Sequence, residues 1–423
     1  MRKRLVVVVA MLAVCAACGS NDGGGSSQAA GSSSSTTTSS PAAAAAPSQF
    51  PGDVAALNDR WALTSVGSGS SCRLSLVDLR SASPKPGQLP TGATCGKAAL
   101  AGDILVISTV DTSKPGGVTP GTVQDRQMVS GIDLTNGQVA WAQELPTDLD
   151  SLRSSPDGAH VAVVRAPIGS DAVNRTKRPL VVLDPRTGQR SWESTDSMAA
   201  VWFAGDVLVA GAQAEDPIDR SLDHYVGFDL AGGKQLWSKP LAMYASCGTL
   251  SLAVGPVSQS GSGVSTKPVW FDAKTGELGA QVPVGTDVFS ASGVSPFNPC
   301  HATDSRLFFG GSNGLGDAKT VAANSDQVAT IRTPSGGRAG VPTGAYTGAW
   351  VWGEDDGTFY RVEVTSGAVS PAMKFPAKFA GAEPHMSSKW ASVSGTPTTG
   401  TTDTTSKNNG YGEKDVTVFV AVT

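Results

Sequence analysis

A phrase of about a dozen residues recurs along this chain and constrains its fold more than any other feature. Each copy has an apolar run rich in β-branched residues, an Asp, a turn that ends in Gly and a short segment that ends in Trp. Copies span residues 129–141, 180–192, 226–237 and 269–278, the last without its Trp, and a weaker copy surrounds Asp78. The Asp residues of successive copies lie 43 to 55 positions apart. A period of this size made of strands predicts a β-propeller.

The local chemistry of the phrase explains why it recurs. Two short strands joined by a turn with Gly at a position of positive φ form a hairpin, and an Asp side chain before the turn accepts hydrogen bonds from its amides. A second apolar strand precedes each copy, so each copy is expected to be the outer half of a four-stranded blade. We expect the Trp residues to pack between neighbouring blades. The residues assigned to this structural role are Asp133, Gly137, Trp141, Asp184, Gly188, Trp192, Asp229, Gly233, Trp237, Asp272 and Gly276.

The number of blades follows from the length that remains. Further strand pairs are expected at 306–324, 349–364 and 390–422, and residues 51–58 are expected to supply the missing strand of the last blade and so close the ring. Residues 51–423 then provide about 47 residues for each of eight blades. Seven blades with an irregular C-terminal hairpin is the alternative.

The Asp-x-x-Thr-Gly-x-x-x-Trp phrase resembles the pyrroloquinoline-quinone-type repeat of quinoprotein-like β-propellers, and the resemblance covers most of residues 55–422. It implies an all-β propeller and does not by itself imply a quinone. Quinone-dependent enzymes of that fold stack the cofactor between a Trp and a disulfide of adjacent cysteines, whereas Cys72, Cys95, Cys247 and Cys300 are each isolated here. We therefore predict no cofactor.

These four cysteines are expected to form two disulfides, because the domain is expected to be exported. Cys72 and Cys95 enclose the first blade, and Cys247 and Cys300 would join the fifth blade to the sixth. The alternative is a metal site that uses Cys300 and His301, but the other three histidines lack ligand spacing. We therefore predict no metal.

The N-terminus has the parts of a lipoprotein signal peptide at residues 1–17. Three basic residues precede an apolar run at 5–14 that is too short to span a bilayer. Residues 14–20 resemble a bacterial lipobox in which Cys18 is lipidated, here with palmitate or a similar acyl chain. The alternative, Cys15, would place a branched Val before the cleavage site. These features predict a lipid-anchored, extracytoplasmic protein at the cell membrane; an ordinary secreted protein is the other interpretation.

Residues 18–50 hold mostly Gly, Ser, Thr, Ala and Pro and cannot bury a core, so they predict a disordered tether, with O-glycosylation of its Ser and Thr as an open alternative. Residues 51–423 form the propeller domain. The chain carries 32 Lys and Arg against 36 Asp and Glu, a formal net charge of −4, and no basic run follows residue 4. This balance argues against a nucleic-acid partner.

No catalytic motif is evident, and we predict no catalytic residue and no enzyme. Phosphate-binding loops are missing, histidine is too scarce to place a Ser/His/Asp set from its spacing, and residues 354–357, Glu-Asp-Asp-Gly, match a hairpin turn better than a calcium loop. The hypothesis is a monomeric propeller that binds an envelope protein, peptide or glycan through its channel or through the long inserts at 111–126, 213–224, 255–267 and 395–413. The alternatives are a scaffold subunit of an envelope assembly complex or a quinone-dependent or hydrolytic enzyme.

Overall fold

The structure is a computed structural model, which describes residues 48–422 except for several segments. The segments left out are 68–71, 82–83, 88, 90–96, 112–125, 146–148, 166–179, 195–197, 214–221, 241, 255–267, 282–299, 311–316, 324, 326, 376–378 and 398–415. The predicted signal peptide, Cys18 and nearly all of the predicted tether lie outside the described residues. Within them there is no helix that is long and apolar enough to cross a membrane.

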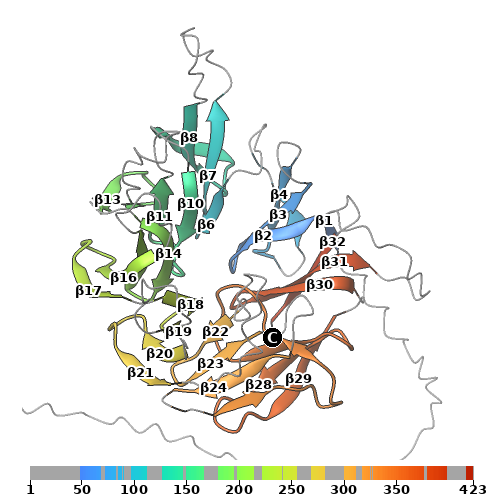
Figure 1. Cartoon of the computed structure of the whole chain (residues 1–423). Coiled ribbons are helices and arrows are strands. Elements are labelled where there is room, and N and C mark those ends of the chain that lie inside the picture. Colours follow the sequence, from blue (N-terminus) through green and yellow to red (C-terminus); the bar gives the residue numbers. More distant parts are fainter. Residues whose placement is uncertain are drawn as a thin grey trace, which may run out of the picture. The chain divides into compact units, whose positions relative to one another are not determined.

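Eight antiparallel sheets of four strands follow one another along the chain, coloured from blue to red in Figure 1. Blade 1 holds β2 (Asp53–Leu57), β3 (Trp61–Val66), β4 (Arg73–Asp78) and β5 (Lys85–Pro86). Blade 2 holds β6 (Ala98–Ala101), β7 (Ile104–Asp111), β8 (Arg126–Asp133) and β9 (Gln138–Leu145). Blade 3 holds β10 (Leu149–Ser154), β11 (Val161–Arg165), β12 (Leu180–Leu183) and β13 (Arg190–Glu193). Blade 4 holds β14 (Met198–Ala204), β15 (Val207–Gln213), β16 (Leu222–Asp229) and β17 (Gln235–Lys239).

The second half of the chain repeats this plan. Blade 5 holds β18 (Ala242–Cys247), β19 (Leu250–Val254), β20 (Pro268–Asp272) and β21 (Leu278–Gln281). Blade 6 holds β22 (Cys300–Ala302), β23 (Arg306–Phe309), β24 (Lys319–Ala322) and β25 (Val328–Thr330). Blade 7 holds β26 (Ala339–Gly340), β27 (Trp350–Gly353), β28 (Thr358–Val362) and β29 (Val369–Lys374). Blade 8 holds β30 (Phe379–Met386), β31 (Trp390–Pro397), β32 (Val416–Ala421) and β1 (Gln49–Pro51). The predicted all-β propeller with eight blades is confirmed.

The ring is closed by a strand that precedes the one expected. β1 pairs antiparallel with β32, with Phe50 opposite Thr417, whereas Asp53–Leu57 is the first strand of blade 1. The prediction that residues 51–58 close the ring is therefore wrong by one strand. Phe50 explains the choice, because it is buried and packs edge-on against Phe419 with ring centroids 5.7 Å apart.

Replacing Phe50 with Ala is expected to lower the free energy of unfolding by about 3 kcal/mol, because it empties the apolar contact that holds the closing strand. Urea unfolding monitored by circular dichroism measures the loss. The neighbouring exposed Gln49 provides the control, since Gln49→Ala keeps the strand and its backbone pairing. An equal loss in both variants would contradict the role assigned to the Phe50 ring.

The core lies between the blades. Eight apolar clusters are present among the described residues, and each joins two neighbouring blades; the cluster of blades 3 and 4, for example, packs Val182 and Trp192 against Leu208 and Phe228. The sequence pattern accounts for this arrangement, because the second and third strands of a blade are covered on both faces and are therefore apolar at almost every position.

The turns of the repeat are built as their chemistry requires. The side chain of Asp133 accepts the amide N–H of Thr135 at 2.8 Å, and Asp184 and Asp272 accept the corresponding amides of their own turns at 2.7 and 2.8 Å. Asp229 accepts the amide of Gly232 at 2.8 Å. The turn glycines have φ between +68° and +73°; these are Gly137, Gly188, Gly233 and Gly276.

The Trp side chains of the repeat connect each blade to the next. The indole N–H of Trp141 donates to the carbonyl oxygen of Pro185 at 2.7 Å, and that of Trp192 donates to Leu230 at 2.8 Å. Both carbonyls directly follow the repeat Asp of the neighbouring blade. The indole of each repeat Trp lies against the turn glycine of the next blade, where a Cβ atom on the glycine would overlap the ring. The pairs are Trp141 with Gly188, Trp192 with Gly233 and Trp237 with Gly276.

Blade 5 has lost the Trp of its outer strand but keeps an equivalent link. Trp270 lies in its third strand, is buried, and donates its indole N–H to the carbonyl oxygen of Ser325 in blade 6 at 3.2 Å. A Trp at another position thus makes the contact between blades that the repeat position makes elsewhere.

Candidate binding site at the channel mouth

First strands of neighbouring blades contact one another around much of the ring, as β6 does with β2 and β10 and as β18 does with β22, and are therefore the innermost strands. Where they end, two adjoining cavities of ≈ 430 and ≈ 260 Å³ open. Both cavities are lined by Pro156, Ala345 and Ser388, so they form one depression, which we call the channel mouth. Every blade contributes to it; one residue from each of blades 1 to 8 in turn is Asn58, Gly102, Pro156, Trp202, Gly248, His301, Ala345 and Ser388.

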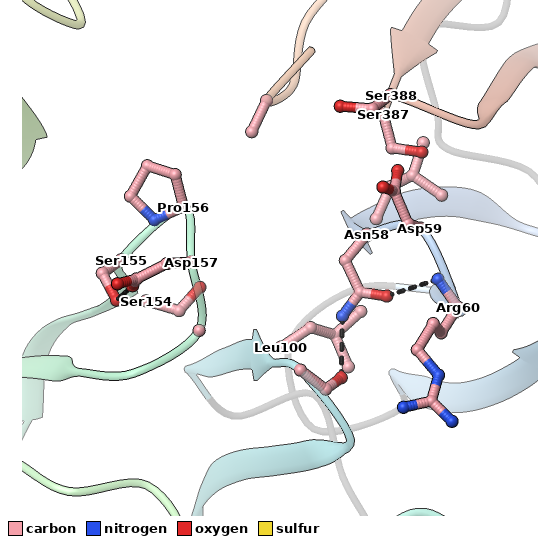
Figure 2. Close-up of a pocket in the computed structure, with 14 residues that line it drawn as sticks. Asn58, Asp59, Arg60, Leu100, Ser154, Ser155, Pro156, Asp157, Ser387 and Ser388 are labelled. Atoms are coloured by element: carbon pink, nitrogen blue, oxygen red, sulfur yellow. Dashed lines mark hydrogen bonds between the residues drawn. The ribbon is translucent and has the colours of Figure 1, made fainter. Parts of the chain in front are cut away.

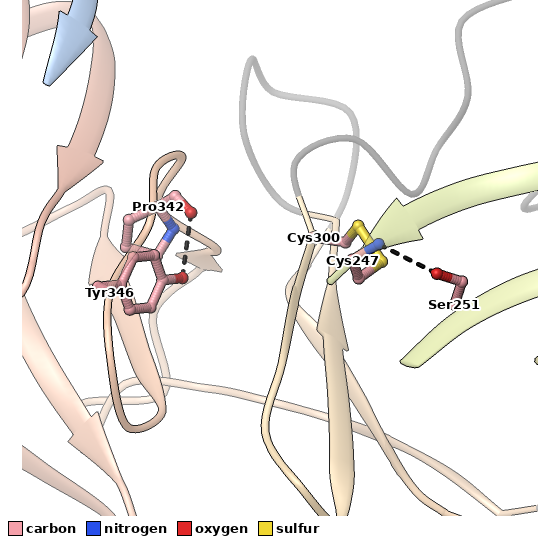
Figure 3. Close-up of a disulfide and its surroundings, with 5 residues drawn as sticks. All are labelled: Cys247, Ser251, Cys300, Pro342 and Tyr346. Carbon is pink, nitrogen blue, oxygen red and sulfur yellow. Dashed lines mark hydrogen bonds between the residues drawn. A yellow bond between two sulfur atoms is a disulfide. The ribbon is translucent and has the colours of Figure 1, made fainter. Parts of the chain in front are cut away.

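The larger cavity has an uncharged and partly aromatic wall. Trp202 and Phe203 of β14 line it on one side, and the disulfide Cys247–Cys300, which joins β18 to β22, lines it on another. Figure 3 shows this disulfide and, apart from it, Tyr346, with the amide N–H of Cys247 donating to Ser251 Oγ at 3.4 Å. Among the described residues that line this cavity there is no Asp, Glu, Lys or Arg.

Residues 341–349, which we call the mouth loop, leave blade 7 between β26 and β27 and line both cavities. The loop attaches to the innermost strand of blade 8 by a parallel bridge between Thr343 and His385. The amide N–H of Thr343 donates to Pro384 O at 3.0 Å, and the amide N–H of Met386 donates to Thr343 O at 2.8 Å. The loop is thus held to β30 by paired backbone hydrogen bonds.

Gly344 allows this close approach. Its φ is +121°, a conformation that side chains with a Cβ rarely adopt, and a Cβ at this position would overlap the carbonyl oxygen of Met386. Gly is therefore required where the loop contacts β30.

On its other side the mouth loop is attached to blade 6. The ring of Tyr346 stacks on His301 with centroids 4.0 Å apart and planes 18° apart. Because a carbonyl oxygen only accepts, His301 Nε2 must carry the proton of its 2.8 Å hydrogen bond to Gly348 O. The hydroxyl of Tyr346 donates to Pro342 O at 3.1 Å within the loop itself.

Burial keeps His301 and Tyr346 of the mouth, and the neighbouring His385 of β30, uncharged. Desolvation lowers the pKa of His301 to about 4, although its hydrogen bond to Gly348 acts in the other direction. The pKa of His385 is also lowered to about 4 by desolvation, against its hydrogen bond to Glu383 O. Burial raises the pKa of the Tyr346 hydroxyl well above its usual value. At neutral pH the larger cavity therefore presents neutral groups.

The two histidines make stability depend on pH. Their folded pKa of about 4 lies below the value of about 6.5 for an unperturbed His, so between these pH values the unfolded chain binds protons that the folded chain does not. We expect the free energy of unfolding to fall as the pH drops from about 6.5 to 4. Urea midpoints measured across this range test it, and the double variant His301→Gln, His385→Asn should show a flatter slope. An unchanged slope would contradict the assignment.

The smaller cavity is lined by more polar and charged side chains than the larger one. The side chain of Asn58 donates to Gly102 O at 2.9 Å and accepts the amide N–H of Arg60 at 2.9 Å, as Figure 2 shows. Asp157 is on the opposite wall, where its carboxylate accepts the hydroxyl of Ser155 at 2.5 Å. Burial alone would raise the pKa of Asp157. The hydrogen bonds from the Ser155 hydroxyl and the Ala159 amide outweigh burial, so the net pKa is lowered and the carboxylate stays charged.

The predicted site residues are divided between the mouth and the outer strands. The pair Cys247–Cys300 lies at the mouth, and Cys72 is also in a disulfide, but its predicted partner Cys95 lies outside the described residues. Cys18 lies outside them too. The repeat Asp, Gly and Trp residues do not line the mouth cavities. Within the described part of the chain no three His, Cys, Asp or Glu side chains are grouped as metal ligands.

Sequence reasoning missed the mouth loop, and with it Thr343, Gly344 and Tyr346. One signal was present: six of the eight blades join their first and second strands by two or three residues and blade 3 by six, whereas blade 7 uses nine, residues 341–349. Trp202 was missed because an apolar innermost strand does not reveal which of its residues faces an opening.

The described part of the chain is an eight-bladed β-propeller with an aromatic channel mouth. A scan against protein-family models finds no match, and a search of the curated proteins finds none either. Among solved structures the chain is similar to BamB from Moraxella catarrhalis, with 15% identity, a TM-score of 0.39 and coverage of 77% of this chain and 94% of that chain. It is similar to dihydro-heme d1 dehydrogenase NirN, with 14% identity, a TM-score of 0.45 and coverage of 83% and 70%. It is also similar to acylaminoacyl peptidase from Pyrococcus horikoshii, with 12% identity, a TM-score of 0.44 and coverage of 82% and 57%. At these values we base no functional argument on the likeness.

Proposed function

We propose that this protein is a lipid-anchored binding protein of the bacterial cell envelope, which holds a protein, peptide or glycan ligand in the channel mouth. The observation that carries the proposal is the depression to which all eight blades contribute. Concave sites of 300 to 1,000 Å³ lined by aromatic groups with a few polar ones are typical of ligand sites. No catalytic role is assigned to any residue.

The two cavities differ in what they can bind. The larger one, of ≈ 430 Å³, has neutral walls made by Trp202, Phe203 and Tyr346 and suits an uncharged ring, such as an aromatic side chain or the apolar face of a sugar. The smaller one offers the Asp157 carboxylate for polar contacts, whereas the Arg60 guanidinium is already ion-paired with Asp103. A ligand that spans both would place an apolar group beside a polar one.

Filling the mouth tests the proposal. Ala345 is exposed and lines both cavities, so Ala345→Trp occupies them without disturbing the core. We expect peptide and glycan arrays to show ligands of the unmodified protein whose binding falls about tenfold or more in Ala345→Trp. Ala231→Trp, in an exposed turn that lines neither cavity, is the matched control. Absence of any ligand on either array, or equal binding by both variants, would overturn the proposal.

The anchor is tested separately. Cys18→Ala should release the protein from the membrane fraction and abolish incorporation of a labelled fatty acid, while Cys15→Ala should leave both unchanged. If Cys15→Ala has the effect instead, the anchor is misassigned. Chemical crosslinking in intact cells then identifies partners, and one stoichiometric membrane complex lost in Cys18→Ala would favour the scaffold alternative over ligand binding. The long inserts proposed as contact surfaces lie largely outside the described residues.

A further inference from the structure

Two carboxylates lie on opposite walls of the smaller cavity of the channel mouth. Asp59 belongs to the turn between β2 and β3 of blade 1, and Asp157 belongs to the turn between β10 and β11 of blade 3. Figure 2 shows the two side chains on either side of the cavity. A ligand in the smaller cavity therefore has a negative charge on each side of it.

Each carboxylate has one oxygen that is available to a ligand. Oδ1 of Asp157 accepts the hydroxyl of Ser155 at 2.5 Å and the amide N–H of Ala159 at 3.0 Å. Oδ1 of Asp59 accepts the amide N–H of Lys389 at 3.0 Å. No hydrogen bond from another described residue reaches Oδ2 of either side chain. Because the Oδ1 bonds already hold both side chains, little entropy is lost when Oδ2 binds a donor.

The protein supplies no cation to this pair of carboxylates. Arg60 is the only Lys or Arg among the described residues that line the smaller cavity, and its guanidinium is ion-paired with Asp103. Lys389, whose amide binds Asp59, does not line the cavity. Neither Asp59 nor Asp157 has an ion-pair partner among the described residues. The smaller cavity therefore favours a positively charged group from a ligand.

The larger cavity favours a different group. Its aromatic wall of Trp202, Phe203 and Tyr346 is uncharged and suits a ring. The two cavities share three lining residues, so one short ligand can reach both. Side chains of residues i and i+2 in an extended peptide project to the same side about 7 Å apart. A peptide can thus place a ring in one cavity and a cation in the other.

We propose that the ligand of the channel mouth is a peptide segment in which a Lys or Arg and an aromatic residue are separated by one residue. The ammonium or guanidinium lies between Asp59 and Asp157 and donates to their Oδ2 atoms, and the ring packs against Trp202. This inference rests on the proposed ligand site and names the chemistry of its ligand. A peptide is favoured over a glycan, because the hydroxyl groups of a sugar are neutral and gain little from two negative charges.

Defined peptides test the charge preference on the full-length protein. The probes are short peptides with blocked ends that contain one Tyr and, two positions before or after it, Lys, Arg, Gln or Glu. Both carboxylates are at least partly exposed, so each contributes a few-fold to affinity. We expect the Kd of the Lys and Arg peptides to be on the order of tenfold lower than that of the Gln peptide, with the Glu peptide weakest. Raising the salt from about 0.05 to 0.5 M should reduce this preference.

Charge-removing variants assign the preference to the two carboxylates. Asp59→Asn and Asp157→Asn keep an Oδ1 acceptor for the amides that bind there and remove the negative charge. The double variant should bind the Lys and Gln peptides with Kd values within about twofold of each other. Glu277→Gln is the matched control, because Glu277 is exposed and lines neither cavity, and it should keep the full preference. Circular dichroism establishes that each variant is folded.

The outcomes separate this inference from the ligand site itself. Ligands that are lost in Ala345→Trp but bind equally well with Gln in place of Lys would overturn the inference and leave the site in place. A preference for Lys that persists in the double variant, or binding of glycans only, would overturn it as well. The absence of any ligand would overturn both proposals. If the double variant did not fold, the comparison of Lys with Gln peptides on the unmodified protein would still decide.

Discussion

Replacing both Cys247 and Cys300 with Ser is expected to lower the free energy of unfolding by about 4 kcal/mol. The bond closes a segment with a sequence separation of 53, and a loop of that size restricts the unfolded chain strongly. It also holds blade 6, whose first strand has only three residues, to blade 5. Urea unfolding of the oxidised protein and of the double variant measures the difference.

Two controls separate the bond from the side chains. Reducing the unmodified protein should destabilise it at least as much as the double variant, because reduction also opens the disulfide of Cys72. Ser251→Ala removes the hydroxyl that accepts the Cys247 amide and keeps the disulfide, so its cost should be about 1 kcal/mol. A double variant as stable as the unmodified protein would show that strand pairing alone holds blades 5 and 6 together.

Replacing Trp192 with Ala is expected to cost about 4 kcal/mol, because the indole fills the space between blades 3 and 4. Its ring centroid lies 5.4 Å from that of Phe228, it covers Gly233, and its N–H donates to Leu230 O. Removing the indole leaves a cavity between the sheets of blades 3 and 4. The backbone pairing within each sheet keeps the two sheets from moving together to fill that cavity. Urea unfolding again gives the loss.

The equivalent Trp of blade 4 provides the matched comparison. The indole N–H of Trp237 is buried without a hydrogen-bond partner among the described residues, whereas that of Trp192 is paired. Trp192→Phe should therefore cost about 1 kcal/mol more than Trp237→Phe, since only the first loses a bond. Equal costs would mean that the link between blades rests on ring packing alone.

The repeat could be predicted because its information is local. Asp133 and Gly137 lie four residues apart, and the turn they make needs no other part of the chain, so its place in the sequence indicates its place in a blade. The closing strand could not be predicted in the same way. Phe50 pairs with a strand more than 360 residues away, and its choice over residues 53–57 depended on which segment could fill the space beside Phe419.

The sequence by itself determined the fold class, the blade plan and the pairing of Cys247 with Cys300, because period, turn chemistry and strand pattern are each expressed within a few tens of residues. Only the tertiary structure decided the channel mouth. His301 and Tyr346 are 45 positions apart and stack because blades 6 and 7 are neighbours, and Thr343 reaches His385 because the mouth loop leaves its own blade. Their contacts depend on the closed ring, which brings the ends of eight innermost strands to one place.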